Sequence, residues 1–199
     1  QEIVNPEKLI PATVEIVDIA GLVKGASKGE GLGNKFLANI RETDAIIHVL
    51  RCFDNDNITH VDGSVDPIRD KEIIDIELQL KDLESLNNRL EKVSRTVKSG
   101  DKEAAREKEV LNQAISFIES SNNIRSIDLD EDDINKYLKP LQLITSKPVL
   151  YVCNVDERSV TSTNSYVESV KSLISDEGAN LIVLAAGIES EIIELEDYE

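Results

Sequence analysis

The chain has 199 residues, of which 40% are hydrophobic and 31% are charged, a balance that excludes an intrinsically disordered protein. Its 39 acidic residues outnumber 22 basic ones, and the net charge of −17 argues against a protein that coats nucleic acid uniformly. No apolar run reaches the length of a membrane span, and Cys52 and Cys153 lie in apolar runs typical of buried thiols, so we expect a cytoplasmic protein without a membrane segment.

Four short runs rich in Ile, Val and Leu predict β-strands. Each is almost continuously apolar, as is typical of strands covered on both faces of a parallel sheet. The four runs are residues 12–18, 45–51, 148–154 and 180–185. Helical stretches at residues 34–42 and 163–177 lead into the second and fourth runs. Strands that alternate with helices predict an α/β fold, with a mostly parallel sheet flanked by helices.

Residues 70–98 break this alternation, because apolar residues recur there every three or four positions, as on one face of an amphipathic helix. Residues 99–101 supply a turn, and a second helical pattern follows it. Two helices joined this tightly predict an antiparallel hairpin. The predicted division of the chain is a sheet domain of residues 1–68 and 128–199 and an inserted hairpin of residues 69–127.

The predicted hairpin carries a local excess of positive charge. Residues 89–108 hold seven basic and four acidic side chains, although the chain as a whole is acidic. Two interpretations stay open, a solvated helix surface of mixed charge and a contact surface for a polyanion such as RNA. On the second interpretation, we expect the contact to be carried by Arg89, Lys92, Arg95 and Lys98.

Polar residues follow the predicted strands, at the edge where open parallel sheets bind their ligands. Asp18 ends the first strand and Gly21 follows it. In phosphate-binding NTPases, an Asp-x-x-Gly of this kind holds Mg²⁺ through water and brings the glycine N–H close to the terminal phosphate. Asn154 ends the third strand and Glu157 follows, a pattern suited to reading a purine edge. Each motif alone is weak, but their order and their placement at strand ends are informative together.

Two further features of these loops have competing interpretations. The glycine-rich stretch after Asp18 does not open a helix directly, so we favour a loop that reorders around a ligand over a dinucleotide-binding loop. His60, in the polar loop after the second strand, either positions water or donates to phosphate, or is a structural loop residue. His48 lies in the middle of a strand and is expected in the core.

Residues 17–34, VDIAGLVKGASKGEGLGN, resemble the switch II region of the YchF subfamily of Obg-related P-loop NTPases. The likeness continues through residues 36–42, 48–53 and 56–61, and the hairpin insertion fits the same family. Residues 154–157 and 185–191 fit it as well, so the resemblance covers essentially the whole chain. It implies a partial Ras-like G domain with an inserted coiled-coil hairpin.

The resemblance also implies a nucleotide switch that hydrolyses the β–γ phosphate bond with Mg²⁺, prefers ATP to GTP and associates with ribosomes. Asp18 would contact Mg²⁺ through water, and Gly21 would sense the terminal phosphate. Leu22 occupies the position where Ras-like enzymes place a water-orienting Gln, which implies slow intrinsic hydrolysis. The residues implied to hold the base are Asn154, Val155, Glu157, Ala185, Ala186 and Gly187.

The sequence departs from the family pattern in two places. It contains no Gly-x-x-x-x-Gly-Lys-[Ser/Thr] loop, and the small C-terminal TGS module of the family is absent. We therefore expect a fragment of a protein nearly twice as long, inactive in hydrolysis on its own because the P-loop supplies the phosphate cradle. The alternative hypothesis is a non-catalytic module for RNA or protein, working through the hairpin with a vestigial nucleotide site. The sequence leaves the activator and the oligomeric state open.

Overall fold

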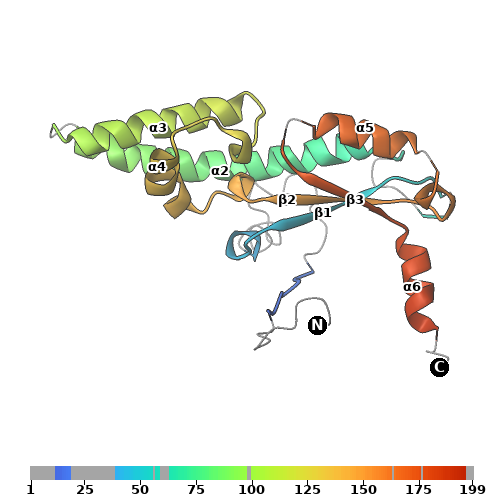
Figure 1. Cartoon of the computed structure of the whole chain (residues 1–199). Coiled ribbons are helices and arrows are strands. Elements are labelled where there is room, and N and C mark those ends of the chain that lie inside the picture. Colours follow the sequence, from blue (N-terminus) through green and yellow to red (C-terminus); the bar gives the residue numbers. More distant parts are fainter. Residues whose placement is uncertain are drawn as a thin grey trace.

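The computed structural model describes residues 12–18, 39–55, 57–58, 63–97, 100–162, 164–175 and 177–195. In this part of the chain, a three-stranded sheet carries helices on one face, and a long helical hairpin extends beyond the end of the sheet (Figure 1). The predicted α/β class, with a mostly parallel sheet, is confirmed.

The sheet consists of β1 (Ile46–Arg51), β2 (Val149–Asn154) and β3 (Asn180–Leu184), in that order and all parallel. Each strand lies within one residue of its predicted bounds. Arg51 pairs with Asn154 at the carboxyl ends of β1 and β2, so the loops after these strands leave the sheet side by side.

The predicted first strand, residues 12–18, is wrong in this structure. These residues form no strand and all are exposed, with Val14 83% and Ile16 77% accessible. The strand was predicted from the β-branched side chains of these residues, which are common in strands. A strand also needs a neighbour to pair with, and among the described residues β1 pairs on one side only, with β2.

The predicted hairpin is confirmed as α2 (Pro67–Val97) followed by α3 (Lys102–Glu119). The turn between them uses Gly100 at φ +84°, a backbone conformation that favours glycine. Asp101 then caps α3, since its side chain accepts hydrogen bonds from the backbone N–H of Glu103 at 2.8 Å and Ala104 at 3.3 Å.

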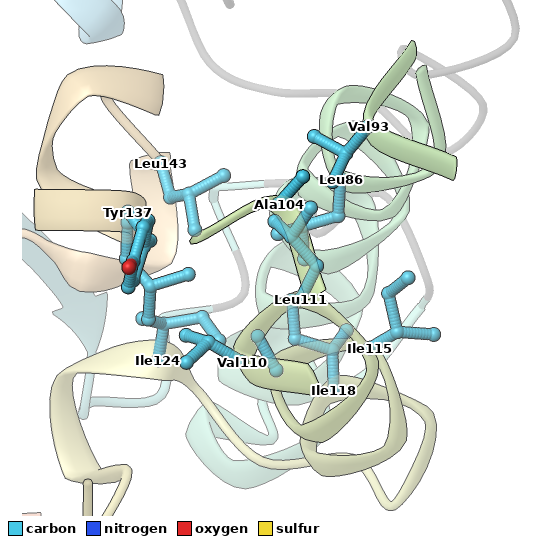
Figure 2. Close-up of a cluster of buried hydrophobic side chains, with 12 residues drawn as sticks. Leu86, Val93, Ala104, Val110, Leu111, Ile115, Ile118, Ile124, Tyr137 and Leu143 are labelled. Carbon is cyan, nitrogen blue, oxygen red and sulfur yellow. The ribbon is translucent and has the colours of Figure 1, made fainter. Parts of the chain in front are cut away.

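The hairpin has a hydrophobic cluster of its own, to which residues after it also contribute. Figure 2 shows Leu86 and Val93 of α2 and Leu111 of α3 in this cluster, together with Tyr137 and Leu143 from the chain that follows. The sequence analysis ended the inserted hairpin at residue 127. Because later residues pack on the hairpin, the structure favours an end of the insertion beyond that residue. The division into domains itself stays a prediction.

Short helical turns occupy much of the chain after α3. Their bounds are η2 (Ile124–Ser126), α4 (Glu131–Asp133), η3 (Ile134–Leu138), η4 (Lys139–Leu141), η5 (Ile144–Ser146) and η6 (Arg158–Val160). Asp130 caps α4 through the N–H of Asp132, within the acidic run of residues 128–133.

Helices α2 and α5 (Ser165–Leu173) cover one face of the sheet, and a buried ion cluster attaches α2 there. The Lys71 ammonium lies 2.7 Å from the Asp75 carboxylate and 2.6 Å from that of Glu177, the residue shortly before β3. The Tyr151 hydroxyl of β2 donates to the other oxygen of Glu177 at 2.9 Å. These contacts join α2, β2 and the chain leading into β3.

The opposite face of the sheet is apolar and open to solvent in the described part of the chain. Ile47 is 51% exposed, Val49 60% and Ile182 45%. Helix α6 (Ala186–Glu194) extends away on this side in Figure 1 and buries none of its side chains. None of the helices in the described ranges is long and apolar enough to cross a membrane.

Candidate functional site

The carboxyl end of the sheet brings together the loops that follow β1, β2 and β3. Asn154, half-buried at the end of β2, accepts a hydrogen bond on its side-chain oxygen from the Ala186 N–H at 3.0 Å. The Val155 N–H donates to the Leu184 carbonyl at 2.9 Å, and the Cys52 N–H donates to the Asn154 carbonyl at 2.8 Å. Three segments far apart in the sequence are thereby fixed side by side.

The residues predicted at this edge differ in exposure. Val155 and Ala185 are buried and anchor their loops to the sheet, whereas Glu157 is exposed. Ala186 and Gly187 are exposed at the start of α6, and no atom lies within 4 Å of where a side chain on Gly187 would begin. The backbone at residues 186–187 is therefore open to solvent next to Asn154.

Asp156 has a local structural role between Val155 and Glu157. Its carboxylate accepts a hydrogen bond from the Ser159 N–H at 2.8 Å, which closes the turn into η6. Hydrogen bonds from the hydroxyl and N–H of Ser159 hold the pKa of Asp156 below its usual range. Both carboxylates are exposed, but Asp156 is engaged within its own loop.

The remaining predicted residues of the phosphate side are not assembled in the described structure. Asp18 is exposed and outside the sheet. Gly21 and His60 lie outside the described residues. Within the described ranges, no group of three or more His, Cys, Asp or Glu side chains is arranged to hold a metal ion. A nucleotide-bound Mg²⁺ needs fewer protein ligands, because phosphates and water complete its shell, and a carboxylate such as that of Asp18 has the oxygen donors that this ion prefers.

On the hairpin, two of the predicted contact residues are already paired with acids. Arg89 binds Glu107 of α3 through two hydrogen bonds, at 2.5 and 3.0 Å, and Arg95 pairs with Glu91. Lys92 is exposed beside them, and Arg89 and Lys92 line a groove of about 210 Å³ between the helices. Lys98 lies outside the described residues.

Comparison with known proteins identifies the chain's relatives. A family model described as "50S ribosome-binding GTPase" matches residues 3–87. The "Ribosome-binding ATPase YchF" of Haemophilus ducreyi is 51% identical over 198 residues, which are all of this chain and 54% of that protein. Along its whole length, the chain is similar to this YchF protein. The YchF of Bacillus subtilis is likewise 50% identical over 200 residues and is matched over 54% of its length.

The structural comparison agrees. The solved structure of the Schizosaccharomyces pombe YchF GTPase superimposes with a TM-score of 0.80 at 35% identity, covering 98% of this chain and 54% of that one. The chain therefore spans about half the length of the YchF relatives it matches. The resemblance inferred from residues 17–61, and the partial Ras-like G domain that it implied, are confirmed.

Sequence reasoning missed the side chains that shape the loop after β1. Asn164 caps α5 with its oxygen, through the N–H groups of Tyr166 and Val167, and its amide nitrogen donates to the Cys52 carbonyl at 2.9 Å. Arg51 donates to main-chain carbonyls of the same loop. The cap is readable from an Asn before a helical pattern, but no sequence signal marks a side chain that binds backbone carbonyls.

Proposed function

We propose that the carboxyl edge of the sheet binds the base of a purine nucleoside triphosphate, ATP in preference to GTP. It would do so within a protein that hydrolyses the β–γ phosphate bond. The observation that carries this proposal is the hydrogen bond from the Ala186 N–H to Asn154, in a chain homologous to proteins named YchF ATPase and GTPase. It joins the two loops expected to hold the base.

Base preference follows from the chemistry of Glu157. An aspartate at this position of a guanine site accepts hydrogen bonds from guanine N1–H and N2–H₂. The longer side chain of Glu157 carries its carboxylate one methylene further out and need not keep that geometry. Adenine has neither an N1–H nor a 2-amino group. A site with an exposed Glu157 therefore discriminates less against adenine than a guanine site with aspartate does.

The phosphate side of the proposal rests on Asp18, Gly21 and Leu22. Mg²⁺, when bound with the nucleotide, neutralises charge on the terminal phosphates. Asp18 would hold that ion through water, and Gly21 would present its N–H to the terminal phosphate. Leu22 cannot orient water, so hydrolysis would be slow unless another group, such as His60, or a partner supplies that function.

Calorimetric titration of Mg-ATP and Mg-GTP into the protein tests the proposed base site. ATP should bind more tightly than GTP, and Asn154→Ala should weaken both by about tenfold, because it removes a base contact and releases Ala186. Glu157→Asp should shift the preference toward GTP by about tenfold. Glu168→Gln, which alters an exposed carboxylate on α5, serves as the matched control.

Tighter binding of GTP by the unmodified protein would contradict the assignment of base preference. Unchanged affinities in Asn154→Ala would contradict the site itself. If neither nucleotide binds, the hairpin module becomes the surviving hypothesis.

We also propose a ribosomal partner, contacted through the hairpin. Relatives carry the name ribosome-binding ATPase, and a ribosomal role agrees with the cytoplasmic location expected from the sequence. The hairpin suits a contact element because it has its own hydrophobic cluster and extends past the sheet (Figure 1). Lys92 and Arg95 are exposed on it.

Co-sedimentation with ribosomes tests this contact, with substitutions chosen so that a loss of binding is not caused by unfolding of the hairpin. Lys92→Glu combined with Arg95→Glu should release the protein if the basic patch is the contact. Exchanging the paired charges, Arg89→Glu with Glu107→Arg, keeps the interhelical ion pair while moving the positive charge to α3. Full retention of binding in the Lys92/Arg95 variant would show that the patch is a solvated surface.

A further inference from the structure

Arg51 ends β1 and lies directly opposite Asn154 in the register of the two strands. Its guanidinium donates three hydrogen bonds to main-chain carbonyls of the loop that follows. Nε donates to Phe53 at 3.1 Å, Nη1 to Ile58 at 3.0 Å and Nη2 to Asn55 at 3.2 Å. The guanidinium carbon also lies 4.8 Å from the centroid of the Phe53 ring. A single side chain therefore contacts the loop at three points between residues 53 and 58.

The same loop is fixed from the side of α5. Asn164 binds the Cys52 carbonyl at 2.9 Å while it caps α5. The hydroxyl of Tyr166, in the first turn of that helix, lies 3.1 Å from both oxygens of the Asp54 carboxylate. The loop is thus hydrogen-bonded both to the end of β1 and to the start of α5. In addition, the N–H of Cys52, its first residue, donates to the carbonyl of Asn154.

We propose that Arg51 is a positioning residue of the nucleotide site, which holds the loop of residues 53–58 beside Asn154 and thereby sets the affinity for the base. This role rests on the proposed function, because it takes the edge around Asn154 to be the base end. Arg51 acts through the backbone of the loop and touches no reacting atom.

The chemistry requires arginine at this position. Three carbonyls at different points of the loop are reached by three nitrogens of one planar, permanently charged group. A lysine keeps the charge and most of the length, but its compact ammonium cannot span the same three acceptors. Arg51→Lys therefore separates the fork geometry from the charge.

Two measurements on the protein test the proposal. Without nucleotide, backbone hydrogen exchange at Asn57 and Ile58, whose N–H groups bind within the loop, should become about tenfold faster in Arg51→Lys. In calorimetry with Mg-ATP, the same variant should raise Kd by about tenfold at an unchanged stoichiometry. A variant that is merely destabilised would lower the stoichiometry and leave the Kd of the folded fraction unchanged.

Arg106→Lys is the matched control, because Arg106 also makes several side-chain hydrogen bonds but lies on α3, away from the sheet edge. It should alter neither measurement. A Kd for Mg-ATP in Arg51→Lys within twofold of the unmodified value would overturn the proposed role. Failure of the unmodified protein to bind Mg-ATP would overturn the proposed function instead, and hydrogen exchange would still test whether Arg51 holds the loop.

Discussion

His48, expected in the core from its position in the middle of a strand, is partly buried in β1 and belongs to none of the hydrophobic clusters of the described residues. Its ring lies 5.7 Å from that of Tyr151, and burial lowers its pKa to about 4. Asp75 and Glu177 oppose this shift, whereas the positive charges of Lys71 and Arg125 add to it. The folded protein therefore keeps His48 neutral at pH values where the unfolded chain protonates it.

This histidine makes stability depend on pH. Between pH 6.5 and about 4, the unfolded chain binds the proton and the folded protein does not, so the free energy of unfolding falls as the pH is lowered. The loss across that window should approach about 3 kcal/mol. Urea unfolding of the protein and of His48→Leu at pH 7, 5.5 and 4.5 measures it. Parallel loss of stability in the two proteins would show that His48 does not titrate on unfolding.

At the scale of elements, Asp82 attaches the hairpin to the sheet. It is fully buried in the middle of α2 and accepts hydrogen bonds from the N–H groups of Ile144 and Thr145, at 2.8 and 2.7 Å. The Thr145 hydroxyl adds a third bond at 2.7 Å. These donors belong to η5, just before β2, so one carboxylate joins the long helix to the chain that enters the sheet.

Asp82→Ala should lower the free energy of unfolding by about 3 kcal/mol, because it leaves three donors buried without an acceptor. Thr145→Val removes the hydroxyl bond to Asp82 and also the acceptor of the Ile124 N–H, 3.3 Å away, and should cost about 2 kcal/mol. Glu84→Ala is the control on the same helix, since Glu84 forms an exposed pair with Lys81 and its loss should cost under about 0.5 kcal/mol. Equal free energies of unfolding in urea for Asp82→Ala and Glu84→Ala would refute the role of Asp82 in attaching α2 to the chain before β2.

At the scale of the whole molecule, local patterns predicted most of the architecture. Apolar runs marked three of the strands, and the three-to-four-residue spacing marked the hairpin, because both periods are written within single elements. The prediction of a strand at residues 12–18 was wrong because strand formation depends on a partner strand that is distant in the sequence. Residues 128–143 were assigned to the sheet domain because nothing in their sequence shows that they pack on the hairpin.

The candidate site was predicted unevenly for the same reason. Strand-end motifs indicated the edge at which Asn154 and Ala186 meet, since parallel strands bring their carboxyl ends together. Arg51 was not predicted, because its partners are backbone carbonyls, which every residue offers.

Backbone-amide NMR spectra of the protein with and without Mg-ATP test the central claim most directly. If the carboxyl edge of the sheet is the base site, the largest shift changes should fall on residues 52–58, 154–157 and 185–187. Changes confined to the hairpin beyond residue 84, with the sheet edge unaffected, would contradict it.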